Sequence, residues 1–294
     1  MGMVVTATLT MVPTGASAAA VRAIPCNATL LANAIAAANA VPATLRLATH
    51  CVYDITAQLP QVTGNVSLVG GPSTTIRHDP GTMANFRLLD VGSTGALRVL
   101  GIFLQNGNPT GDGGAIRNAG RLVLNHVTIS GNIAGDVITP VGGNGGGLAN
   151  LAGGRAVVAS STISGNDATR APVEMTTGNG GGIYNAGRLT LFFSRLYANN
   201  ATSTSATAGT GNGGGISTPT GGNSLVLQTT VAENTATNDG GGVFNAGTTA
   251  VVRTLVVRDR TALGGGIFGA TTVRRSIVRG NTPDNCVPAN AGCN

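Results

Sequence analysis

Apolar positions alternate with polar or small ones along most of this chain, in short runs separated by glycine and asparagine. Leu122 and Leu124 lie two residues apart, and so do Leu189 and Leu191. This spacing is that of a β-strand with one buried face. Within Asp112–Asn281 no run has the 3.6-residue period of an amphipathic helix. The pattern therefore predicts many short strands.

The predicted strands belong to a motif that recurs six times and is clearest in the 22 residues of Gly180–Ala201. Each copy opens with glycines and an aliphatic residue, continues with an alternating run, and closes with aliphatic-x-x-Asn. The opening aliphatic residues are Ile116, Leu148, Ile183, Ile216, Val243 and Ile267, at intervals of 32, 35, 33, 27 and 24 residues. Self-similarity at such a period indicates a repeat architecture.

Three short strands per copy, with glycine at the corners, predict one coil of a β-helix. One coil cannot bury its own inner face, so each coil stacks on the next with strands roughly 4.8 Å apart. Leu45–Asn108 alternates without the glycine signature, which predicts irregular first coils. We expect an all-β parallel β-helix of about eight or nine coils.

Asparagines fall into two columns when the copies are aligned. The first column is Asn118, Asn150, Asn185 and Asn245, and the second is Asn132, Asn166, Asn199, Asn234 and Asn281. In the fifth copy Asp259 takes the asparagine slot of the second column. Asparagine tolerates left-handed turn geometry, and stacked amides can bond one another. We expect both columns to be structural.

The glycine-rich openings and the closing aliphatic-x-x-Asn resemble the repeats of the polymorphic membrane protein family over about Asp112–Asn281. Members of that family are right-handed parallel β-helices, similar in fold to pectate lyases. The resemblance implies a right-handed, single-stranded helix for this chain. The larger members of that family resemble autotransporter passengers and carry a C-terminal outer-membrane barrel.

The ends of the chain carry different signals. Residues 1–20 read as a secretion signal, with Met3–Val12 as the apolar segment and an Ala-x-Ala cleavage pattern ending at Ala18. The predicted organisation is a single β-helix domain over 21–294, with a capping helix at 28–40, irregular coils at 45–108, repeat coils at 109–282 and a disulfide-closed end at 283–294. Asn27 is a suitable N-cap for that helix, and Pro42 follows its end.

Four cysteines allow three pairings, and pairing near neighbours would close each end of the helix. The expected disulfides are Cys26–Cys51 and Cys286–Cys293, each worth roughly 2.5–3.5 kcal/mol. Disulfides and a secretion signal together predict a secreted or cell-surface protein. After the signal no apolar stretch is long enough to predict a transmembrane helix.

The basic residues are all arginine, 17 in number against 11 acidic residues, which gives a net charge of +6. Arg121, Arg155 and Arg188 occupy one slot on three successive coils. Like charges about 5 Å apart repel by roughly 0.8 kcal/mol per pair in water, and a repeated anion would relieve this. The alternative is that these arginines only solubilise the helix. A second basic group comprises Arg253, Arg258, Arg260, Arg274, Arg275 and Arg279.

Candidate catalytic acids are few. Asp112 and Asp239 share a slot four coils apart, roughly 19 Å, whereas glycosidase carboxylates lie about 5–9.5 Å apart. Only Glu233, Asp239 and Asp259 could meet, and we expect a surface ion-pair patch there. No Cys-x-x-Cys occurs and the histidines are scattered, so neither metal nor cofactor is expected.

These observations predict a secreted or cell-surface, non-catalytic protein that binds an anionic glycan or an envelope component. The arginine row is the expected ligand site. A polysaccharide lyase or glycoside hydrolase acting on acidic polysaccharide is the alternative, and a structural spacer is a third possibility. Nucleic acid is not an expected partner, because no basic patch is interleaved with aromatic residues.

Overall fold

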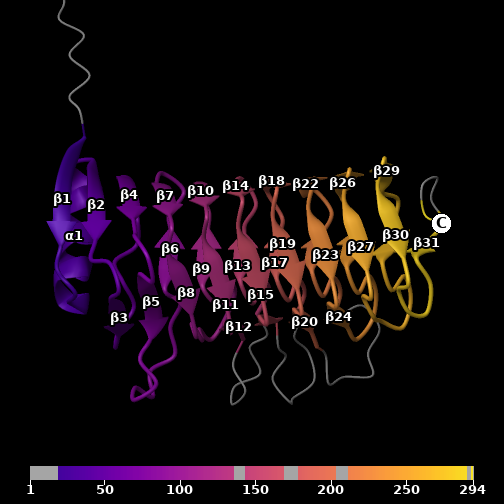
Figure 1. Cartoon of the computed structure of the whole chain (residues 1–294), viewed down its shortest axis with the longest axis horizontal. Helices are drawn as coiled ribbons and strands as arrows, with labels where there is room; N and C mark the ends of the chain where they lie inside the picture. Colours follow the sequence, from indigo (N-terminus) through magenta and orange to yellow (C-terminus); the bar gives the residue numbers. More distant parts are fainter. Residues whose placement is uncertain (1–18, 136–142, 169–177, 203–210, 290–292, 294) are drawn as a thin grey trace, which may run out of the picture.

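The chain is a right-handed parallel β-helix whose strands stack along one axis, as Figure 1 shows. The computed structural model describes residues 19–135, 143–168, 178–202, 211–289 and 293. Most of the predicted signal, residues 1–18, lies outside the described residues, as do the centres of the three long inserts. In the described part every strand pairing is parallel, and the strands form four sheets, here called A to D.

Sheet A carries the alternating runs. Its strands, in spatial order, are β1 (Ala20–Ile24), β2 (Ala43–Leu47), β4 (Asn65–Val69), β7 (Ala96–Leu100), β10 (Arg121–Asn125), β14 (Arg155–Ala159), β18 (Arg188–Phe192), β22 (Asn223–Leu227), β26 (Thr248–Val252) and β29 (Thr272–Arg274).

Sheet B carries the closing aliphatic residues. Its strands are β3 (Val52–Ile55), β5 (Thr75–His78), β8 (Phe103–Gln105), β11 (Thr128–Ser130), β15 (Thr162–Ser164), β19 (Arg195–Tyr197), β23 (Thr230–Ala232), β27 (Leu255–Val257) and β30 (Ile277–Arg279).

Sheet C carries the residues that follow the glycine-rich openings. Its strands are β6 (Leu89–Val91), β9 (Ile116–Asn118), β13 (Leu148–Asn150), β17 (Ile183–Asn185), β21 (Ile216–Thr218), β25 (Val243–Asn245), β28 (Ile267–Phe268) and β31 (Cys286–Val287).

Sheet D was not predicted. Its two-residue strands β12 (Ile133–Ala134), β16 (Asp167–Ala168), β20 (Asn200–Ala201) and β24 (Thr235–Ala236) directly follow the second asparagine column. The middle coils therefore have four short strands rather than the three expected. The additional strands are too short to produce an alternating sequence signal.

The interior is aliphatic, as the alternation predicted. The opening residue Ile183 is fully buried, and so are Leu189 and Leu191 of the same coil. In β18 the intervening residues face outward with intermediate or full exposure. Since equivalent residues stack in register from coil to coil, the buried side chains form one continuous core.

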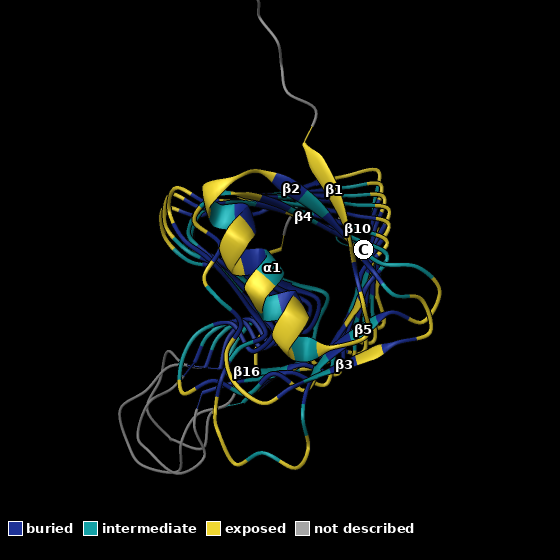
Figure 2. Cartoon of the chain, turned by 90° about the vertical axis from the view of Figure 1, so that its left-hand side faces the viewer, coloured by how far each residue is buried: buried dark blue, intermediate teal, exposed yellow. Residues whose placement is uncertain are grey.

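Helix α1 (Ala28–Ala40) covers the N-terminal end of this core (Figure 2). The Asn27 side chain caps it by accepting a hydrogen bond from the Leu30 backbone N–H at 2.9 Å. Three residues of the helix itself, Leu31, Ile35 and Ala38, are fully buried against the core. Both predicted disulfides are present: Cys26–Cys51 beside this cap and Cys286–Cys293 at the other end.

Glycine is required where each copy opens. Gly180 has φ +69°, and a Cβ there would lie 2.3 Å from the Ile183 carbonyl oxygen. Neither the left-handed backbone nor this close approach suits a residue with a side chain. The recurring glycines therefore let the chain turn sharply into sheet C.

The asparagine columns form hydrogen-bonded ladders. In the first column Asn118 Nδ2 donates to Asn150 Oδ1 at 2.7 Å, and Asn150 Nδ2 donates to Asn185 Oδ1 at 2.7 Å. This ladder then changes partners, because Asn185 Nδ2 donates to Ser224 Oγ at 2.8 Å. Asn245 lies in the same column but bonds Ala270 and Thr249 instead.

Candidate functional site

The arginine row lies at the start of three neighbouring strands of sheet A. Arg121, Arg155 and Arg188 are the first residues of β10, β14 and β18 and pair directly in register. All three side chains are exposed. No carboxylate of the described residues forms an ion pair with any of them. The row therefore presents three cations at the strand spacing, roughly 4.8 Å apart.

The surface beside the row is slightly hollowed. A shallow depression of about 240 Å³ is lined by Arg155, Arg188, Asn223 and by glycines of the turns between sheets C and A. These turns stack closely: a Cβ at Gly187 would lie 2.3 Å from the Gly154 carbonyl oxygen. Of the residues that line this depression, only Arg155, Arg188 and Asn223 have side chains larger than a methyl group.

The candidate acids Glu233, Asp239 and Asp259 do not form one surface group. Glu233 is exposed at a corner and forms an ion pair with Arg258 at 3.3 Å. Asp259 is fully buried, so the expectation of a surface patch is wrong for this residue. Asp259 Oδ1 accepts hydrogen bonds from the backbone and side-chain nitrogens of Asn234 at 2.8 and 2.9 Å.

Asp239 belongs to a third polar column, which comprises Asp112, Asn144, Asn179, Asn212 and Asp239. In every member of this column except Asp112, the backbone N–H donates a hydrogen bond to the side-chain oxygen of the preceding member, at 2.8 to 3.1 Å. Burial raises the pKa of Asp239. The sequence showed the shared slot of these residues but not this chain of hydrogen bonds.

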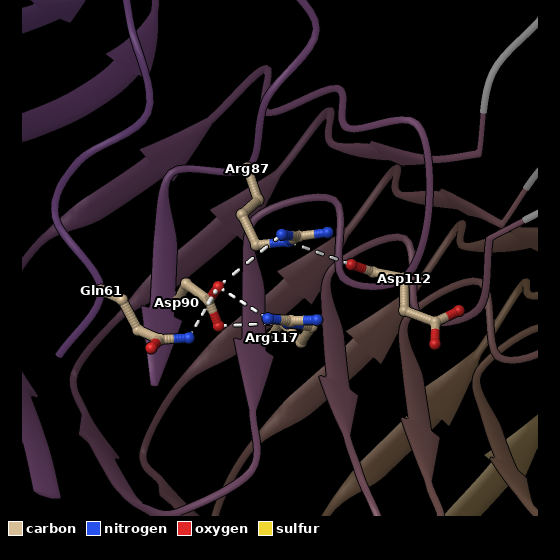
Figure 3. A network of polar contacts seen from close by, with 5 residues as sticks. All are labelled: Gln61, Arg87, Asp90, Asp112 and Arg117. Atoms are coloured by element: carbon tan, nitrogen blue, oxygen red, sulfur yellow. Dashed lines mark hydrogen bonds and ion pairs between the residues drawn. The ribbon is translucent and has the colours of Figure 1, made fainter. Parts of the chain in front are cut away.

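A network of charged side chains on the outer face of sheet C was missed by the sequence analysis (Figure 3). Arg117 forms two hydrogen bonds to Asp90, Nε to Oδ1 at 3.1 Å and Nη2 to Oδ2 at 2.9 Å. Gln61 Nε2 donates to the same Oδ2 at 3.3 Å. Arg87 lies 3.8 Å from that oxygen and donates through Nε to the Asp112 carbonyl at 3.2 Å.

Burial and pairing both act on the charges of this network. The Asp90 side chain is only 5% exposed, against 15% for Arg87 and 35% for Arg117. Hydrogen bonding to Asp90 raises the pKa of Arg117, whereas burial and then repulsion from Arg117 lower the pKa of Arg87. Each cation has a carboxylate beside it, so the network ties the irregular coils to the first repeat coil.

The second basic group lies at the C-terminal end of the helix. Arg258 and Arg279 border a depression of about 430 Å³ with Leu255, Val257 and Gly280. A neighbouring depression of about 420 Å³ contains Glu233, Arg258 and Arg260. One of these arginines, Arg258, thus has a carboxylate partner, unlike the members of the arginine row.

Within the described ranges no three His, Cys, Asp or Glu side chains are grouped closely enough to hold a metal ion. In the same ranges no helix has the length and apolarity needed to cross a membrane. The two disulfides indicate an oxidising compartment.

Comparison with protein-family models and with curated proteins finds no match to this sequence. The parallel β-helix is therefore established by the structure, and the family of the chain stays a resemblance based on its repeats.

Proposed function

We propose that this protein is a secreted or cell-surface β-helix that binds a linear anionic glycan along Arg121, Arg155 and Arg188, without catalysing a reaction. Supporting this, the three exposed guanidinium groups lie in register and lack a carboxylate partner among the described residues. Adjacent like charges repel, and a ligand with regularly spaced carboxylates or sulfates would remove that repulsion.

The direction of the arginine row indicates the shape of the ligand and how it would lie on the protein. The arginines follow one another along the axis of the helix, so a polymer lying parallel to that axis would meet them one after another. Arg155 and Arg188 also border the glycine-floored depression. A ligand that spans the row gains one charge-assisted contact per coil, whereas a single acidic sugar gains one contact only.

The proposal is tested by titrating the full chain with oligogalacturonates of increasing length at low salt. Affinity should rise steeply until the oligomer reaches all three arginines and then level off. The Arg121→Ser/Arg155→Ser/Arg188→Ser variant should bind at least tenfold more weakly to the longest oligomer. Equal binding by this variant would overturn the proposed site, and release of unsaturated or reducing ends would establish a lyase or a hydrolase instead.

A further inference from the structure

Asp259 occupies an asparagine position in the second column. The closing residues Val231, Val256 and Val278 pair in register, which places Asp259 between Asn234 and Asn281. Its side chain is fully buried, like those of Asn132 and Asn166 in earlier coils. A carboxyl group therefore stands where the other coils have an amide.

The asparagines of this column each donate in two directions. Asn166 Nδ2 donates backward to the Ile129 carbonyl at 3.0 Å and forward to Asn199 Oδ1 at 2.9 Å. Asn199 Nδ2 repeats this with the Ile163 carbonyl at 2.9 Å and Asn234 Oδ1 at 3.0 Å. In this column the side-chain nitrogen of each asparagine thus lies between two acceptors, a backbone carbonyl of the preceding coil and the Oδ1 atom of the next asparagine.

At Asp259 an oxygen takes the place of that nitrogen. Oδ1 accepts from Asn234, as the asparagine Oδ1 atoms accept from the coil before them. A Cβ at Gly242 would lie 2.7 Å from Asp259 Oδ2, as one at Gly215 would lie 3.2 Å from Asn234 Nδ2. Oδ2 is buried, and no group of the described residues donates a hydrogen bond to it. The acceptors equivalent to those of the other coils are the Val231 carbonyl and Asn281 Oδ1.

We infer that Asp259 is a buried proton-binding site, whose carboxyl group stays protonated in the folded chain and donates through Oδ2 to one of these two acceptors. An ionised carboxylate has no donor, so it would place a buried charge against two oxygen atoms. The protonated acid instead reproduces one of the two hydrogen bonds that asparagine makes here.

Nearby charges do not provide a counter-ion at Oδ2. Glu233 and Arg258 form their ion pair on the surface, and Arg260 and Arg279 are also exposed. The other acidic residues of these coils are Asp239, which belongs to the third polar column, and Asp284. Burial raises the pKa of Asp259 to about 8; the hydrogen bonds from Asn234 lower it and Glu233 raises it further.

The sign of the pH effect follows from this shift. An unfolded aspartate has a pKa of about 3.9, so between about pH 4 and pH 8 the folded chain holds a proton that the unfolded chain has released. The stabilisation is complete below pH 4 and is lost as the pH rises through 8. The unfolding constant of these coils should therefore grow by up to about tenfold per pH unit in that range. Protonation of Asp259 therefore stabilises the last two coils, which carry the second basic group.

Hydrogen exchange of the full chain at pH 5 and pH 8 tests the inference, with Asp259→Asn as the variant. At each pH the two proteins share the same intrinsic exchange rates at amides other than those of residues 259 and 260, so the ratio of their observed rates at those amides reports stability. At pH 8 the variant should protect amides beyond Gly240 at least tenfold better than the wild type, and at pH 5 this advantage should shrink. An equal ratio at both pH values, or weaker protection of the variant at pH 8, would overturn the inference.

A reciprocal variant and a direct titration complete the test. Asn199→Asp puts an acid at an equivalent position, so it should create the same pH dependence in the middle coils. If that variant does not fold, carboxyl-carbon NMR of the wild type decides. A chemical shift of Asp259 typical of the neutral acid at pH 6.5 supports the inference, and the shift of an ionised carboxylate contradicts it.

Discussion

Arg117 and Arg121 lie four residues apart in the chain, on the consecutive strands β9 and β10, yet their surroundings differ completely. Arg117 pairs in register with Asp90, which it bonds through two nitrogens. Arg121 has Ala96 on one side and Arg155 on the other. In a parallel β-helix, whether a surface arginine is neutralised therefore depends on the residue that lies beside it, in register, on the neighbouring coil.

The comparison separates two uses of one residue type. On sheet C Arg117 holds neighbouring coils together, because it forms two hydrogen bonds to the nearly buried Asp90 carboxylate, and Arg87 lies beside the same carboxylate. On sheet A the arginines repel one another and contribute little to stability, since exposed charges are well solvated. Arginines that are not bonded to a carboxylate of a neighbouring coil are available to a ligand.

The largest effect is expected where the paired arginines lose their carboxylate. Asp90→Ala should reduce the free energy of unfolding by about 2–3 kcal/mol, because it leaves two partly buried cations uncompensated. The partial exposure of Arg117 limits the loss. Urea unfolding measures the change. Glu233→Ala is the control: it removes an exposed ion pair and should cost less than about 1 kcal/mol.

Oligogalacturonate binding by folded Asp90→Ala should equal that of the wild type, since the network is not in the proposed site. Equal unfolding midpoints for the wild type and Asp90→Ala would show that the sheet C network does not stabilise the fold. The pairing of Arg117 with Asp90 would then contribute no more to stability than the unpaired arginines of sheet A do.

A smaller effect is expected when the unpaired row is given a partner. Asn223 lies beside Arg188 in register and borders the same depression. Asn223→Asp should pair with Arg188, weaken oligogalacturonate binding two- to threefold, and stabilise the fold by less than about 1 kcal/mol. Calorimetric titration measures the binding. Tighter binding by this variant would mean that Arg188 does not contact the ligand.

The sequence was sufficient to predict the regular part of the molecule. Residues such as Ile183 and Leu189 recur at fixed places in each copy, and this recurrence correctly predicted the buried face and the parallel coils. The capping helix was predicted separately, from its own apolar spacing between Asn27 and Pro42. The disulfide pairing followed from the separate positions of the cysteines at the two ends. Strands with one buried face leave a clear sequence pattern, because apolar and polar residues alternate along them.

The sequence was not sufficient where that recurrence stops. Asp90 lies in the irregular coils, so its register with Arg117 could not be counted from a motif. Strands such as Ile133–Ala134 are too short to show a period. Asp259 was recognised in its asparagine slot but interpreted as a surface acid, because its burial depends on the column around it rather than on its own neighbours in the chain.

The most direct test of the arginine row compares two triple variants with the same formal charge. One replaces Arg121, Arg155 and Arg188 with serine, and the other replaces Arg253, Arg274 and Arg275, which also have no carboxylate partner among the described residues. Binding of a long oligogalacturonate is measured for both at low salt. A loss of at least tenfold in the first variant alone is the predicted result. Equal losses in both variants would mean that net charge, rather than the row, attracts the polymer.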